Sequence, residues 1–217
     1  MTALANGAAE IIPVAEIDEA LAARRRQPGV LLAGERNGVL IHADLAGGIE
    51  FDLGNSPREF TRERVSGKTI VMTTTNGTRA LRACAGAKTV LAGSFLGLRA
   101  IGRWVEEQKP RHLLLVCSGT VDQASYEDVL GAGALCEVVW ELYSGGQIAD
   151  SAAIARDLYH STRSDLSNGM QKARNGRRLL GLPELRDDVR FCLQRDTLDF
   201  VAELSAEGAV RKAGFKM

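Results

Sequence analysis

Short apolar runs alternate with amphipathic helical segments along most of the chain, and this alternation limits the fold more than any other feature. We expect strands at residues 9–14, 30–33, 70–72, 89–92 and 113–117, and helices at 17–26, 78–85, 98–108 and 126–143. Strands that are apolar on both faces belong to a sheet that helices cover on both sides. The pattern therefore predicts an α/β fold, a three-layer α/β/α sandwich around a largely parallel or mixed sheet.

The last third of the chain is less regular, with helices expected at about 152–160 and 172–180 and a final segment over 189–204. The 217 residues contain no internal repeat and no linker rich in Pro and Ser, which predicts a single domain over residues 1–217. Residues 1–7 look like the last turn of a helix that ends at Gly7.

Charge and hydropathy exclude several classes of partner. The 27 basic and 27 acidic side chains balance, whereas nucleic-acid binding needs an excess of Lys and Arg. No apolar run reaches the roughly 18 to 20 residues of a membrane helix. The four cysteines are far apart and form no C-x-x-C pair, so we expect buried free thiols and a cytoplasmic protein.

Ligands of open α/β sheets bind beyond the carboxyl ends of the parallel strands, which directs the search to four strand exits. The first exit carries Glu35 and Arg36 directly after an expected buried strand, before an Asn-Gly turn. A charged pair at this place is where a site residue would lie. The alternative is a solvated turn with a local ion pair.

The second candidate segment, residues 51–59, combines a helix start with further polar groups. Ser56, followed by Pro and by Glu59 three positions later, predicts a capping box. Asp52, Gly54 and Asn55 are not needed for the cap and could hold a cation or an oxyanion. An Asx-turn that leads into the helix explains them equally well.

The third exit, residues 72–79, has the strongest signal for phosphate. Hydroxyl groups, an Asn-Gly turn and Arg79 lie between an expected strand and a helix, where backbone amides and the helix dipole favour an anion. The spacing is not that of a Walker A loop. The alternative is a Thr-rich strand end in which Thr78 caps the helix.

The fourth exit combines Ser118 and Gly119 with Glu127 and Asp128 at the start of a helix. Asp128 can pair with Ser125 as a cap, whereas Glu127 has no such task. Magnesium is commonly held by one or two carboxylates together with substrate phosphate and water. The three histidines show no zinc spacing, and no G-x-S-x-G motif supports a serine hydrolase.

Taken in order and spacing, segments 34–36, 51–57, 73–78, 125–128 and 131–133 resemble the 2-phosphosulfolactate phosphatase family of coenzyme M biosynthesis. The resemblance runs from Ala3 to about Leu204. It implies an α/β/α fold and a magnesium-dependent phosphatase that converts 2-phospho-3-sulfolactate, a small anionic phosphoester, into sulfolactate and phosphate.

The resemblance implies Mg²⁺ as the cofactor, and it also implies roles for particular residues. We expect metal ligands at Glu35, Asp52 and Glu127, and catalytic roles for these three together with Asp128, which is a general base or only a cap. Arg36 and Arg79 are expected to clamp the anionic groups. The substrate-binding set is Arg36, Asn55, Ser56, Thr75, Asn76, Gly77, Thr78, Arg79, Ser118 and Gly119.

Family members carry a strand and turn upstream of the segment that matches residues 2–8, and we expect this chain to lack that strand. Two alternatives of function stay open: a non-catalytic domain that binds small anions, and a phosphatase for another small acidic phosphoester. The sequence also leaves open whether the chain forms a homo-oligomer.

Overall fold

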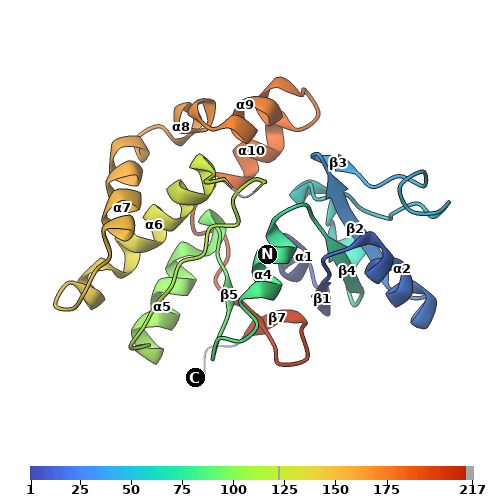
Figure 1. Cartoon of the computed structure of the whole chain (residues 1–217), viewed down its shortest axis with the longest axis horizontal. Coiled ribbons are helices and arrows are strands. Elements are labelled where there is room, and N and C mark those ends of the chain that lie inside the picture. The colour runs from blue at the N-terminus through green and yellow to red at the C-terminus, as the bar shows by residue number, and fades with distance from the viewer. Residues whose placement is uncertain (122, 214–217) are drawn as a thin grey trace. The chain divides into compact units, whose positions relative to one another are not determined.

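The computed structural model describes residues 1–121 and 123–213 (Figure 1). They form two compact units, one of residues 1–92 and 202–213 and the other of residues 93–201. The first contains a mixed sheet and the second is helical, so the expected α/β class is confirmed. The expectation of a single domain stays a prediction.

The first unit is built on a seven-stranded sheet with the order β3-β2-β4-β1-β7-β6-β5. Its strands are β1 (Glu10–Pro13), β2 (Leu31–Arg36), β3 (Val39–Leu40), β4 (Thr69–Thr73), β5 (Leu91–Ala92), β6 (Val201–Leu204) and β7 (Val210–Ala213). The helices of this unit are α1 (Thr2–Ala5), α2 (Ile17–Arg26), η1 (Pro57–Glu59), α3 (Arg62–Val65) and α4 (Gly77–Ala83).

Three parallel strands form the centre that the sequence predicted. Strand β4 lies between β1 and β2, and its Ile70 pairs with Ile11 on one side and Leu31 on the other. Helix α2 packs on these strands through Ala20 and Leu21, which are buried in one apolar cluster with the strand residues. Because the three strands are parallel, their carboxyl ends open at the same edge of the sheet.

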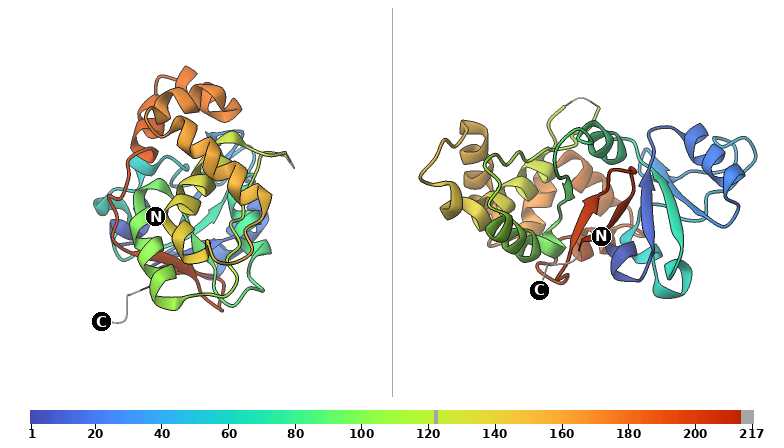
Figure 2. Two further views of the ribbon diagram at one scale, coloured as in Figure 1. Left: turned by 90° about the vertical axis from the view of Figure 1, so that its left-hand side faces the viewer. Right: turned by 90° about the horizontal axis from the view of Figure 1, so that it is seen from below.

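The second unit consists of η2 (Phe95–Gly97), α5 (Leu98–Gln108), α6 (Tyr126–Tyr143), α7 (Asp150–Thr162), α8 (Leu166–Lys172), α9 (Arg174–Gly181) and α10 (Arg186–Cys192). Helix α6 runs between α5 and α7, as the views of this unit show (Figures 1 and 2). Leu130, Ala134 and Tyr159 lie at the centre of its apolar core. No helix among the described residues has both the length and the apolar character needed to cross a membrane.

Two of the expected strands differ from the structure. Residues 113–117 form no strand, and Leu114 and Val116 are 82% and 53% exposed. An apolar run needs a neighbouring strand to complete its backbone hydrogen bonds, and none of the described residues supplies one. The run at 89–92 shortens to β5, which pairs antiparallel with β6. The expected final segment divides into α10 and β6, and the sequence reading missed α8 and β7.

Candidate functional site

The first and third strand exits meet in the first unit, as predicted. The Arg36 guanidinium donates to the Thr73 hydroxyl over 3.0 Å and to the Ala15 carbonyl over 3.4 Å. The Thr73 hydroxyl donates to the same carbonyl over 3.0 Å. Ends of β1, β2 and β4 are thereby joined by side chains at one edge. Arg36, expected to clamp substrate, has protein acceptors in this arrangement.

Glu35 is the most buried charged group of this edge, at 8% exposure. One carboxylate oxygen accepts from the Gly38 amide and the other from the Thr75 amide, each over 2.7 Å. Two backbone donors compensate for the cost of burying the charge. Glu35 therefore fastens the β2–β3 turn to the loop after β4, a structural task that the sequence did not reveal.

The phosphate loop predicted at residues 73–78 is closed by its own side chains. Thr74 and Thr78 exchange bonds, because each amide donates to the other hydroxyl over 3.1 Å. The Thr75 hydroxyl is buried and has no partner among the described residues. Asn76 precedes α4, which begins at Gly77, and Arg79 pairs with Glu16 over 2.7 Å. Three amides of the loop already have acceptors, whereas the Thr75 hydroxyl has no partner among the described residues.

Asp52 lies away from this edge. Its carboxylate accepts from the Leu32 amide over 2.7 Å and pairs with Arg24 near the end of α2. Leu32 is the second residue of β2 and Glu35 the fifth, so about 10 Å of strand separates the two attachment points. Asp52 and Glu35 thus have separate backbone partners at different heights of the sheet.

The capping box predicted at Ser56 and Glu59 is absent. The Ser56 side chain makes no cap hydrogen bond, and the helix it precedes is a single 3₁₀ turn. The Glu59 carboxylate reaches back to the Gly54 amide over 2.8 Å instead. A 3₁₀ turn is too short to present the amides that the box requires. Asn55 is exposed next to this turn.

The fourth predicted site segment lies in the second unit, where it follows no strand because residues 113–117 form none. The Asp128 carboxylate accepts from the Gly119 amide over 2.7 Å and from the Ser118 hydroxyl over 3.2 Å. Burial raises the pKa of Asp128 above its ordinary value, although these two hydrogen bonds act in the opposite direction. The Ser125 side chain does not cap α6 but pairs with Thr120 over 2.6 Å.

Glu127 has one satisfied and one unsatisfied carboxylate oxygen. Oε1 accepts from the Asn175 amide group over 2.5 Å, whereas Oε2 is buried and has no partner in the described part of the chain. The same Asn175 nitrogen donates to the Thr120 hydroxyl over 2.8 Å. Arg174, next to it, donates to the Gln123 side chain over 3.1 Å. Glu127 thus belongs to a polar cluster assembled from two helices and a loop.

Sequence reasoning missed Thr120, Arg174 and Asn175 as members of this cluster. The hydrogen bonds from Asn175 to Glu127 and to Thr120 span 48 and 55 residues, so no local motif predicts them. The only local signal is a polar Arg-Asn-Gly start of helix α9, which is common at helix starts without function.

The carboxylates expected to bind Mg²⁺ do not form one group. Within residues 1–121 and 123–213, no three His, Cys, Asp or Glu side chains come together as a metal site. Glu127 and Asp128 still fit the arrangement in which one or two carboxylates share the ion with substrate phosphate and water. The unsatisfied buried oxygen of Glu127 is an observation that favours a bound ligand there.

Other groups considered in the sequence have ordinary surroundings. His160 pairs with Glu137 over 2.7 Å and His42 with Glu50 over 3.4 Å, which are surface contacts rather than zinc sites. All four cysteines are free, and Cys136 is buried as expected. The expected burial is wrong for Cys117 and Cys192, which are exposed, and Cys84 is only partly buried.

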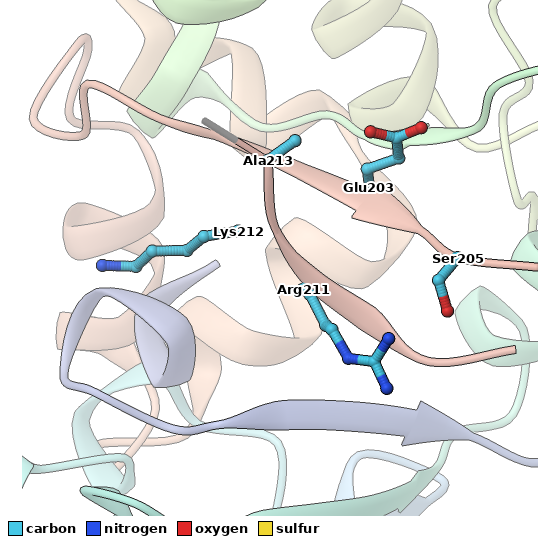
Figure 3. A pocket seen from close by; sticks show the side chains of 5 residues that line it. All are labelled: Glu203, Ser205, Arg211, Lys212 and Ala213. Carbon is cyan, nitrogen blue, oxygen red and sulfur yellow. The ribbon is translucent and has the colours of Figure 1, made fainter. Parts of the chain in front are cut away.

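A hollow of about 250 Å³ lies on β6 and β7, and none of the predicted site residues lines it. Figure 3 shows Glu203 on β6, Ser205 just after its end, and Arg211 and Lys212 on β7. Arg211 is paired with Glu10 over 2.7 Å, so its charge is already balanced. The hollow has the features of an ordinary surface depression.

Comparison with known proteins gives one consistent relationship. The family model described as 2-phosphosulpholactate phosphatase matches residues 1–207. A probable 2-phosphosulfolactate phosphatase of Caldanaerobacter subterraneus is 39% identical over 97% of this chain and 83% of its own length. Proteins of the same description from Symbiobacterium thermophilum and Thermotoga maritima are 37% and 36% identical over 96% and 94% of this chain. They are covered over 86% and 82% of their own lengths. With a matching family model and such relatives, this chain belongs to the 2-phosphosulfolactate phosphatase family.

Proposed function

We propose that this chain is a magnesium-dependent phosphatase that hydrolyses 2-phosphosulfolactate to sulfolactate and phosphate. Membership of the family supports the reaction, and the relatives named above are described as acting on this substrate. Among the structural observations, the one that carries the proposal is the buried, unsatisfied oxygen of Glu127 beside the carboxylate of Asp128. Such an oxygen is expected where a ligand completes the site.

The polar cluster of the second unit supplies the groups that the metal ion needs. Glu127 and Asp128 would hold Mg²⁺, and the bound ion would polarise the phosphoryl oxygen and offset charge on the leaving oxygen. Burial raises the pKa of Asp128, and a bound cation would lower that pKa again because it favours the ionised carboxylate that binds metal. Ser118 and Gly119 keep that carboxylate in place.

Within the first unit taken by itself, the strand exits are proposed to bind an anionic group. Thr75 offers a buried hydroxyl without a partner among the described residues, and Arg36 and Arg79 lie at this edge. Both arginines have acceptors within the protein, so binding would require them to share or exchange those contacts. The Asp52 carboxylate is engaged by the Leu32 amide and by Arg24, and we assign it a structural role. The Ser56 side chain makes no cap hydrogen bond, and it stays a predicted substrate contact.

Phosphate release from synthetic 2-phosphosulfolactate tests the proposal. We expect release with Mg²⁺, loss of release with EDTA, and recovery when Mg²⁺ is restored. Glu127→Gln should lose most activity while the exposed Asn168→Ala on α8 keeps it. The same panel should include a phosphoester that has the carboxylate but lacks the sulfonate.

Each other outcome identifies a different function. Binding of 2-phosphosulfolactate without release indicates a non-catalytic anion-binding domain. Faster release from the ester without the sulfonate indicates another acidic substrate. Release that EDTA does not affect contradicts the metal-dependent proposal.

A further inference from the structure

The side chain of Asn175 links Glu127 to Thr120 in the polar cluster of the second unit. Its side-chain nitrogen has two hydrogens, and the structure commits one to Glu127 Oε1 and the other to the Thr120 hydroxyl. No donor capacity is left over. The amide therefore sets the orientation of the Glu127 carboxylate with respect to the 118–125 loop.

The backbone that carries Asn175 is itself held tightly. Gly176, the next residue, lies so close to the end of α8 that an added Cβ would be 2.1 Å from the Met170 carbonyl oxygen. Arg174, the preceding residue, donates to the Gln123 side chain and to the Thr120 carbonyl. Both neighbours restrict the backbone at the start of α9, so the position of Asn175 is fixed.

The two oxygens of Glu127 differ because of this contact. Oε1 receives a short hydrogen bond, whereas Oε2 is buried without any donor from the described residues. An unpartnered buried carboxylate oxygen is costly unless a cation or a donor reaches it when the ligand is bound. If Asn175 were lost, the carboxylate could turn and satisfy itself elsewhere.

We propose that Asn175 is a positioning residue that holds Glu127 Oε1 so that Oε2 is kept for the magnesium ion. The inference rests on the proposed function in its choice of cation. Groups that orient a metal ligand commonly change metal affinity by 10- to 100-fold when they are removed. Asn175 does not itself touch the reacting atoms in this scheme.

Direct titration with Mn²⁺, followed by the paramagnetic resonance of the free ion, tests the inference on the full chain without measuring turnover. Asn175→Ala should weaken Mn²⁺ binding about 10- to 100-fold. Glu127→Gln should also weaken it, and the double variant should bind no more weakly than Glu127→Gln, because Asn175 acts through Glu127. Asn168→Ala, an exposed asparagine on the neighbouring helix α8, should leave binding unchanged.

Other results overturn the inference. Unchanged Mn²⁺ affinity in Asn175→Ala removes the positioning role, and additive losses in the double variant show that Asn175 acts independently of Glu127. If Asn175→Ala does not fold, Thr120→Val removes one of the two acceptors of the same amide and should weaken binding severalfold. A Mn²⁺ affinity of Thr120→Val equal to that of the wild-type chain would also contradict the positioning role.

The proposed function can fail separately from this inference. If the variants show the expected differences in Mn²⁺ affinity but the wild-type chain hydrolyses no phosphoester, the proposed phosphatase activity is contradicted and the positioning role of Asn175 is retained. A wild-type chain that hydrolyses 2-phosphosulfolactate with Mg²⁺, while Asn175→Ala keeps full Mn²⁺ affinity, contradicts only the positioning role.

Discussion

Two glycines of helix α6 should respond in opposite ways to the same substitution. At Gly133 an added Cβ would lie 1.9 Å from the carbonyl oxygen of Ala155 in α7, whereas at Gly131 it would meet nothing within 4 Å. The helices α6 and α7 lie side by side along this contact (Figure 1). Changing each glycine to alanine therefore separates the effect of helix packing from the effect of helix propensity.

The magnitudes follow from the two environments. Alanine is favoured over glycine in a helix interior by about 0.8–1.0 kcal/mol, so Gly131→Ala should stabilise the protein by up to that amount. In Gly133→Ala, α7 would have to move by about 1.5 Å to restore an ordinary contact of 3.4 Å. Overpacking of a core commonly costs about 1–3 kcal/mol. Because the obstacle is backbone, we expect the upper end, and a net loss of about 2 kcal/mol.

Urea unfolding followed by tryptophan fluorescence measures the difference. Both tryptophans, Trp104 in α5 and Trp140 in α6, lie in the second unit and report on the helices concerned. In thermal unfolding, a loss of about 2 kcal/mol corresponds to a fall of about 4–8 °C in Tm for a chain of this size. Equal stability of Gly133→Ala and Gly131→Ala would refute the close approach of α6 and α7.

Three further changes should have measurable results. Glu35→Gln removes a charged acceptor from a buried amide such as that of Thr75, and should cost about 1.5–3 kcal/mol in urea unfolding followed by circular dichroism; an unchanged midpoint would contradict the fastening role. Hydrogen bonding to His160 and a neighbouring arginine lowers the pKa of Glu137 from its ordinary 4.5. Its stabilisation is therefore present above about pH 4.5 and is lost as the pH falls through the lowered pKa, so Glu137→Gln should flatten this pH dependence. Burial raises the pKa of Cys136, so iodoacetamide at pH 8 should modify it only after urea is added, and fast labelling in the native protein would disprove its burial.

Local signals predicted the elements that depend on local structure. The bounds expected for α5 and α6 agree with those observed, Leu98–Gln108 and Tyr126–Tyr143, because helical periodicity and polar starts lie within each segment. The parallel centre of the sheet also followed from apolar runs alternating with helices. It placed Glu35 and Arg36 beside the loop after β4, as observed.

Apolar composition alone could not decide which runs become strands. Residues 113–117 are as apolar as β4, but strand formation depends on a partner, and partners are chosen by the whole fold. The same reason explains why the sequence did not predict strand β7, with its exposed Arg211 and Lys212, because its pairing with β1 is long-range. Likewise, Ser56 looked like a cap, yet the helix that follows is too short to need one.

The candidate site shows most clearly where sequence reasoning ends. It identified Glu127 and Asp128 from their types and from their place at a helix start, and it could assign Asp128 a partner only by assuming a standard cap. In the structure Asp128 accepts from Ser118 and Gly119 instead, and Glu127 accepts from Asn175. The contact of Asn175 arises from how α9 packs near the start of α6, which no spacing along the chain encodes. Residue type therefore predicted which groups could do chemistry, whereas packing decides which of their oxygens remain available for it.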